Sequence, residues 1–191
     1  MIYNNNEAII EKIESVTKEH LVAWKSARGY APVNVTNKID KIMIDWIISL
    51  TEHLKIWDKN IGNLTIGELI LARTNLGTLV ECWLKFFLVI HLDNYKSKPV
   101  VNKKGKVIKP EKLSFEQLRI YYKDNIFLRS NIKYNNWLES IQHKRNGIHA
   151  FNYKDLGTDE ELHSDFFVYF EFIEHLIDSM PDNPNEFSSN F

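Results

Sequence analysis

The stretch from Thr65 to Asp93 constrains the fold of this 191-residue chain more than any other feature. Thr65 and Glu68 have the spacing of a capping box, in which the two side chains close the first turn of a helix. The second half of the stretch is apolar on nearly every side, which is typical of a helix buried on all faces. It is too short and too interrupted by Glu81, Lys85 and His91 to span a bilayer. We therefore expect a central buried helix and no membrane segment.

The rest of the chain also shows the three-and-four spacing of apolar residues that indicates amphipathic helices. The other expected helices are residues 6–28, 35–57, 114–123, a segment that begins at 131 or 132 and has the Arg145 cluster at its C-terminal end, and 158–180. We find no repeat or linker that would divide the chain. The pattern predicts an all-α fold, an up-and-down bundle of about five helices, four of them long. It forms one domain over residues 1–180, followed by a polar tail at 181–191.

Residues 96–112 interrupt the helical pattern with a basic insertion. Seven lysines meet a single acidic residue, Glu111, and Lys104-Gly105-Lys106 has the composition of a tight turn between two short apolar pairs. A short β-hairpin or an extended loop fits this pattern. Lys103, Lys104 and Lys106 are candidate RNA contacts if the insertion follows a phosphate backbone, and ordinary solvated side chains if it only connects two helices.

Composition narrows the possible chemistry. The chain carries 24 basic and 25 acidic side chains, so any nucleic-acid site has to be a local cluster rather than a property of the whole surface. The single cysteine, Cys82, excludes an intrachain disulfide and a multi-thiolate metal site. We find no glycine-rich phosphate loop, serine nucleophile elbow or His-Glu-x-x-His pair. We therefore expect no metal and no cofactor, and, because no secretory signal is evident, a cytoplasmic location.

The residues from His143 to His149 form the densest cluster of chemically useful side chains. If the helix continues through Gly147, Arg145 and His149 lie at positions i and i+4 on one face, about 5–6 Å apart at Cβ. An arginine and a histidine placed in this way can hold a phosphate and move a proton near neutral pH. The alternative is a basic last turn that only complements the helix dipole. Gly147 lowers helix stability, and the neutral side chain of Asn146 does little for the helix dipole. Neither residue is expected in a turn that only complements the dipole, so both favour a functional site.

Glu81 is unusual within the apolar stretch. We expect its carboxylate either to bond a neighbouring Arg, Trp or Tyr, or to take part in the site.

The segment Arg145-Asn146-Gly147-Ile148-His149-Ala150-Phe151 resembles the Arg-Asn…His signature of HEPN domains, which are small helical bundles of bacterial toxin–antitoxin, abortive-infection and CRISPR effector systems. Residues 76–88 are similar to the long central helix of such proteins, and the helix after Gly157 is similar to the one that closes the bundle. The resemblance covers most of residues 35–180 in layout, but only the short signature is specific.

The resemblance implies a metal-independent endoribonuclease that works as a homodimer with one composite site. Arg145 would clamp the phosphoryl oxygens, His149 would move the proton, and Asn146 would orient Arg145 or the substrate. His143 and Lys144 are candidate RNA phosphate contacts. The partners implied are RNA, a second copy of the chain, and an antitoxin or another defence-system protein.

The sequence departs from the family pattern at one point. Three residues separate Arg145 from His149, which is fewer than is usual in the family. If Lys144 were the cation of the signature in place of Arg145, four residues would separate it from His149. This departure keeps two other functions open. One is a non-catalytic HEPN-like module that binds RNA, a nucleotide or a protein, and the other is a helical oligomerisation protein without a ligand.

Overall fold

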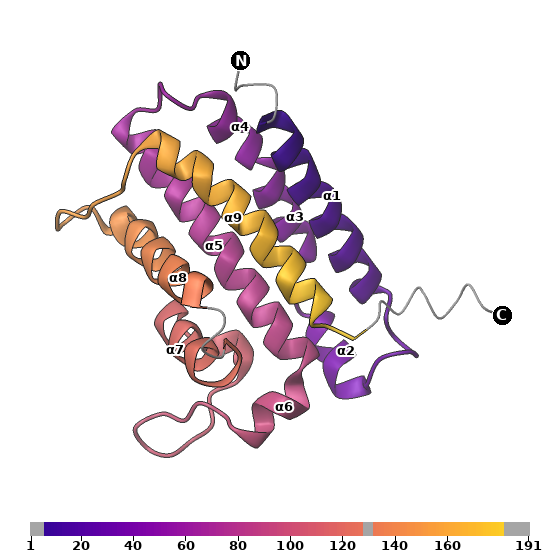
Figure 1. The fold of residues 1–191 in the computed structure, drawn as a ribbon. Coiled ribbons are helices and arrows are strands. Elements are labelled where there is room, and N and C mark those ends of the chain that lie inside the picture. The colour runs from indigo at the N-terminus through magenta and orange to yellow at the C-terminus, as the bar shows by residue number, and fades with distance from the viewer. Residues whose placement is uncertain (1–5, 128–131, 182–191) are drawn as a thin grey trace.

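The computed structural model describes residues 6–127 and 132–181, and within them the all-α prediction is confirmed (Figure 1). The helices are α1 (Asn6–Lys25), α2 (Val33–Ile39), α3 (Ile44–Glu52), α4 (Leu54–Lys59), α5 (Ile66–Ile90), α6 (Leu92–Ser97), α7 (Phe115–Asn125), α8 (Ile132–Arg145) and α9 (Asp159–Asp178). Two short 3₁₀ helices are η2 (Pro110–Lys112) and η4 (Asn146–His149). No helix within these ranges combines the length and the apolar character needed to cross a membrane. The predicted tail lies outside the described residues, apart from Pro181.

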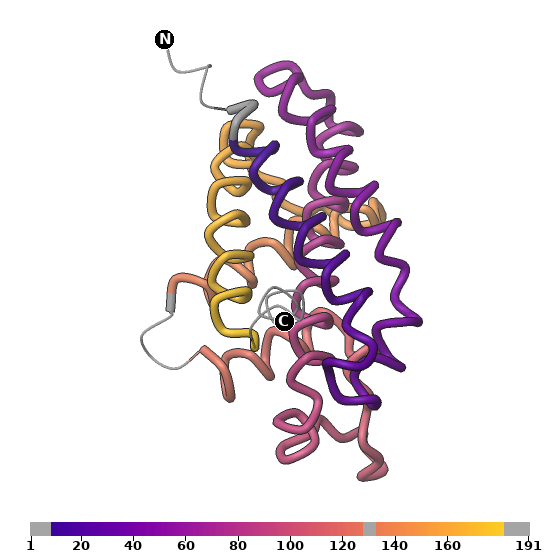
Figure 2. The backbone as a smooth tube through the Cα atoms, turned by 90° about the vertical axis from the view of Figure 1, so that its right-hand side faces the viewer, coloured from indigo at the N-terminus to yellow at the C-terminus, as the bar shows by residue number. Residues whose placement is uncertain are grey.

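Helix α5 is the centre of the bundle, as expected. Its capping box is formed, because Thr65 Oγ1 accepts a hydrogen bond from the Glu68 backbone N–H and the Glu68 carboxylate accepts one from the Thr65 N–H. Figures 1 and 2 show α1 and α3 on one side of α5, α7 and α8 on the other, and α9 alongside it. This placement buries α5 on almost every side, which explains why its sequence lacks a polar face.

The prediction of one helix over residues 35–57 is wrong, because this region forms α2, α3 and α4. Helix α2 ends at Ile39, and Met43, just before α3, has a non-helical ψ of 69°. The chain turns again at His53, between α3 and α4. Each piece still buries its own apolar residues, among them Ile39, Ile47 and Leu54. The apolar spacing therefore continues across both breaks and does not reveal them. The predicted helix 65–93 likewise ends at Ile90, and the short helix α6 follows it.

The basic insertion folds as a hairpin-shaped loop. The backbone N–H groups of Asn102 and Ile108 donate to the carbonyls of Lys106 and Val100, both over 2.9 Å, and a single antiparallel bridge joins Val101 to Val107. Gly105 lies at the tip with a φ of 74°, a backbone conformation that favours glycine. The predicted turn at this glycine is present, although the flanking residues do not form strands.

Gly77 gives a direct test of the packing between α5 and α8. A Cβ built at Gly77 would lie 2.5 Å from Arg145 Cγ and 2.6 Å from Arg145 Cβ, so the two helices are too close there for a larger residue. We expect Gly77→Ala to lower the free energy of unfolding by about 1–3 kcal/mol through overpacking. Urea denaturation followed by circular dichroism measures this change.

Gly67→Ala is the matched control on the same helix. A Cβ at Gly67 has nothing within 4 Å, so alanine there should leave stability unchanged or raise it by up to about 1 kcal/mol through helix propensity. Equal effects of the two substitutions would contradict close packing at Gly77.

Candidate functional site

The signature residues lie where α8 ends, and here the sequence expectation needs a correction. The α-helix does not continue through Gly147; it ends at Arg145 and tightens into η4. Gly147 is buried under the following loop, and a Cβ at this position would lie 2.3 Å from Leu156 Cδ2. In a helix with three residues per turn, positions four apart are separated by about 120° around the axis, against about 40° in an α-helix. Arg145 and His149 therefore do not share one α-helical face.

The Arg145 side chain reaches across Gly77 to the middle of α5. Its Nη2 lies 3.3 Å from Glu81 Oε2, and its side chain is 29% exposed. The other oxygen of Glu81 accepts a hydrogen bond of 2.6 Å from Lys85 Nζ. Glu81 therefore bonds a neighbouring arginine, which is one of the two roles expected for it, and this arginine belongs to the candidate site. Arg145 Nε is buried and has no hydrogen-bond partner among the described residues.

The other signature side chains face outward. His143 and His149 are exposed and Asn146 is half-buried. None of these three side chains makes a hydrogen bond or ion pair within residues 6–127 and 132–181. The exposed surface continues into the loop that follows, where Phe151 is 97% and Tyr153 92% exposed.

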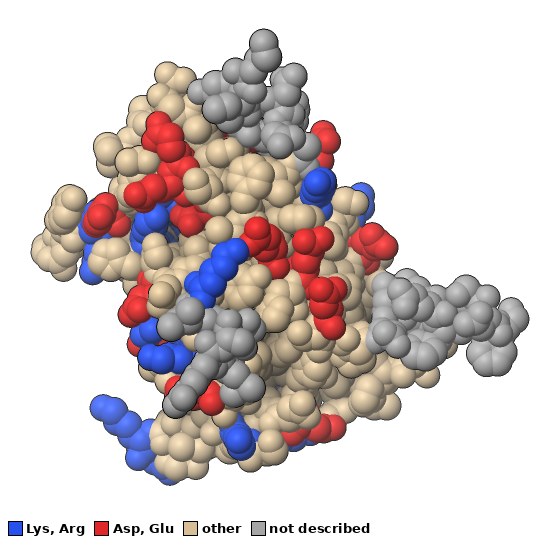
Figure 3. Space-filling view, viewed as in Figure 1, with Lys and Arg blue, Asp and Glu red and all other residues tan. Residues whose placement is uncertain are grey.

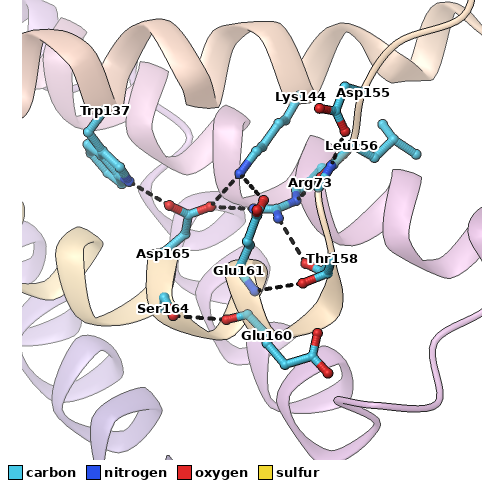
Figure 4. Close-up of polar contacts among 11 residues, drawn as sticks. Arg73, Trp137, Lys144, Asp155, Leu156, Thr158, Glu160, Glu161, Ser164 and Asp165 are labelled. Atoms are coloured by element: carbon cyan, nitrogen blue, oxygen red, sulfur yellow. Dashed lines mark hydrogen bonds and ion pairs between the residues drawn. The ribbon is translucent and has the colours of Figure 1, made fainter.

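Lys144 points in a different direction from His143 and is held inside the protein. Figure 4 shows it extending from α8 toward α9, where its Nζ lies 3.0 Å from Glu161 Oε2 and 3.4 Å from Asp165 Oδ2. Its side chain is only 14% exposed. The structure therefore places this candidate phosphate contact in an internal charge network.

Arg73 is the centre of that network, and sequence reasoning missed it. Its guanidinium is fully buried, forms an ion pair with Asp165, and donates to the carbonyls of Leu156 over 2.9 Å and Thr158 over 3.1 Å (Figure 4). Burial lowers the pKa of Arg73, and the Asp165 carboxylate counteracts part of that effect. The sequence did contain a signal for this ion pair: Arg73 lies on the buried face of α5, and Asp165 lies on the buried face of α9.

This network holds the loop that covers the signature. Trp137 Nε1 donates to Asp165 Oδ1 over 2.9 Å, so α5, α8 and α9 all converge on one carboxylate. Arg73 anchors the backbone at Leu156 and Thr158, and the Leu156 side chain packs over Gly147. The charge network thereby fixes the path of the chain on both sides of the exposed aromatic residues.

The basic loop does not join the signature cluster. Lys103, Lys104 and Lys106 are exposed, but their loop lies at the bottom of the molecule in Figures 1 and 2, whereas α8 ends in its upper half. Figure 3 shows basic side chains projecting at the lower edge, apart from the mixed charges higher on that face. The two groups of predicted RNA contacts therefore form separate surfaces.

Comparisons with protein-family models, curated proteins and solved structures find no match for this chain. Within the described residues, no group of three or more His, Cys, Asp or Glu side chains is arranged to hold a metal ion. The resemblance to HEPN domains therefore rests on the signature residues and on the helical layout.

The charge network predicts that substitutions of Asp165 and Glu161 differ strongly in their effect on the free energy of unfolding. Asp165→Asn keeps the size of the side chain but removes the carboxylate that forms the ion pair with the buried Arg73, so that Glu161 and Asp159 act on the guanidinium only through space. We expect it to lower the free energy of unfolding by about 3–5 kcal/mol, the usual cost of breaking a buried pair. Urea denaturation of the variant measures this loss.

Glu161→Gln is the matched control, because the Glu161 side chain is 55% exposed, forms its ion pair with Lys144, and acts on Arg73 only through space within the described residues. Its expected cost is less than about 1 kcal/mol, as for other surface ion pairs. Similar losses for both variants would argue against a dominant role of Asp165.

Proposed function

We propose that this protein is a metal-independent endoribonuclease of the HEPN type, active as a homodimer and acting in a toxin–antitoxin or phage-defence setting. The observation that carries the proposal is the local geometry at the end of α8, where a partly exposed arginine, a half-buried asparagine and an exposed histidine follow one another. These residue types can supply both the cation and the proton transfer that RNA cleavage requires.

The reaction follows from the chemistry of these side chains. His149 removes the proton of a ribose 2′-hydroxyl, which then attacks the adjacent phosphorus. Arg145 stabilises the negative charge that develops on the phosphoryl oxygens, and His149 of the second copy protonates the departing 5′-oxygen. The P–O5′ bond breaks as the new P–O2′ bond forms, which gives a 2′,3′-cyclic phosphate and a 5′-hydroxyl. The reaction uses no metal in any step.

The surface beside the signature supports dimerisation. Ile148 is 42% exposed, and Phe151 and Tyr153 are almost entirely exposed, so three apolar or aromatic side chains adjoin His149. Exposed apolar groups concentrated in this way are typical of protein interaction sites. A two-fold contact through this loop would bring two copies of His149 near each other, and the composite site requires that arrangement.

Arg145 retains the capacity to bind a phosphate despite its contact with Glu81. A guanidinium carries five N–H donors, and the contact with Glu81 involves only Nη2. The remaining Nη donors are available to phosphoryl oxygens. Asn146 lies next to Arg145 in the chain and can hold the ribose or the arginine itself.

RNA cleavage in EDTA tests the enzyme directly. We expect the wild-type dimer to cut single-stranded or structured RNA and to leave cyclic phosphate ends that are detectable by mass spectrometry. Arg145→Ala and His149→Ala should each reduce the rate by about 100-fold or more, as loss of a charge-stabilising or proton-transfer group typically does. Both variants should remain folded and dimeric by circular dichroism and light scattering.

His53→Ala is the control, because His53 is exposed and its ring contacts the Ser49 carbonyl of the preceding helix α3, away from the signature. It should cleave RNA at the wild-type rate. Cleavage that survives both signature substitutions would place the active site elsewhere, and a wild-type dimer that cuts none of the RNAs would refute the ribonuclease.

A non-catalytic HEPN-like module that binds RNA or a partner protein is the second candidate. Two observations favour it: Glu81 already pairs with Arg145, and η4 rotates His149 away from the face of Arg145. Such a module would bind without cutting.

Glu81→Gln distinguishes the candidates. It removes the carboxylate that competes with phosphate for Arg145, so RNA affinity should rise several-fold, as measured by fluorescence anisotropy. A parallel rise in cleavage supports the enzyme, and a rise in affinity without cleavage supports the module. Unchanged affinity would contradict phosphate binding by Arg145 in either case.

A further inference from the structure

A cavity separate from the signature lies between α2, α3 and the second half of α5. Its volume is about 420 Å³, and the segment at Lys109 and Glu111 closes one edge. Cavities of about 300–1,000 Å³ are the usual size of small-molecule sites in proteins. Neither the composition nor the signature accounts for this cavity, and it plays no part in the proposed cleavage reaction.

The inner wall of the cavity is apolar. Ile47, Phe86 and Val89 line it and are 7%, 1% and 2% exposed, and the partly buried Ile42 adds to them. Cys82 also lines the cavity, and burial raises the pKa of its thiol to about 11, so this side chain is uncharged at neutral pH. This wall favours an aliphatic chain, because these side chains offer no strong hydrogen bonds to the edge of a nucleobase.

The rim of the cavity is cationic. Four lysines line it against one glutamate, and two of them, Lys38 and Lys85, are already paired with Glu111 and Glu81. The other two, Lys41 and Lys109, are exposed, and neither forms an ion pair within residues 6–127 and 132–181. Lys109 also acts electrostatically on Glu111, whose carboxylate is already hydrogen-bonded to Lys38. Two ammonium groups outside any ion pair beside an apolar wall can attract an anionic group to the mouth of the cavity.

We propose that this cavity binds a small amphiphilic anion, a carboxylate or phosphate group carried on an aliphatic chain. The chain lies against Ile47, Phe86 and Val89, and the anionic group lies between Lys41 and Lys109. Burial of the chain supplies most of the binding free energy, and the lysines select the charged end. This site is inferred separately from the proposed ribonuclease, and its test does not require RNA cleavage.

Titration of the full chain with decanoate and with decyl phosphate, followed by calorimetry and by NMR shifts of the cavity methyl groups, tests the proposal. We expect at least one of the two to bind with one-to-one stoichiometry and to shift the resonances of Ile42, Ile47 and Val89. The ligand that binds more tightly identifies the anionic group. Decanol lacks the charge and acetate lacks the chain, so both should bind at least about tenfold more weakly.

The double variant Lys41→Glu, Lys109→Glu tests the charged rim. Reversing both charges should weaken binding of the anion about tenfold or more while leaving decanol unaffected. The matched control is Lys103→Glu, Lys104→Glu, which makes the same charge change in the basic loop and should alter the affinity less than twofold.

Three results would overturn the proposal. These are equal binding of decanol and the anions, equal weakening by the two double variants, or shifts confined to residues outside the cavity. If AMP shifts the resonances of the cavity methyl groups and neither decanoate nor decyl phosphate binds, the cavity is a nucleotide site instead. All the substituted lysines are exposed, so each variant should fold, and circular dichroism verifies this.

Discussion

The buried ion pair between Arg73 and Asp165 is the interaction on which the local structure around the signature depends. Removing two charges from water is costly, and the cost is met only if hydrogen bonds satisfy the remaining donors and acceptors. Here Leu156, Thr158 and Trp137 do so, from the loop after η4, from the start of α9 and from α8. These bonds fix the chain that follows the two exposed aromatic residues, because release of the carbonyls would leave guanidinium N–H donors without partners in the core.

Much of the helical layout could be predicted because it depends on local signals. The capping box at Thr65 and Glu68 is formed in full, and Ser114 and Gln117, which have the same spacing, form a second one. Thr158 and Glu161 share this spacing as well. At Thr158 only half of the motif is present: its hydroxyl accepts from the Glu161 N–H, while the Glu161 carboxylate contacts Lys144. The breaks at Met43 and His53 could not be predicted, because the apolar spacing of residues 35–57 is equally compatible with one helix or three.

The candidate site could be predicted only as a set of residues adjacent in sequence. Sequence spacing placed Arg145, Asn146 and His149 at the end of a helix, and the structure agrees. It could not show that Leu156 would pack over Gly147, that the last turn would be a 3₁₀ helix, or that Lys144 would pair with carboxylates of α9. The first and the last depend on contacts between distant segments, and periodicity indicates burial without specifying which charges meet.

Glu81 is shared by two cations, Arg145 and Lys85, and each of them faces a different surface of the protein. An anion that draws Lys85 toward the cavity would leave the carboxylate to Arg145 alone and strengthen its hold on that side chain. A phosphate that draws Arg145 outward would tighten the bond between Glu81 and Lys85 in return. If both proposed ligands bind, thermodynamic linkage requires these two effects to be equal in free energy, and the shared carboxylate of Glu81 would make the two sites antagonists.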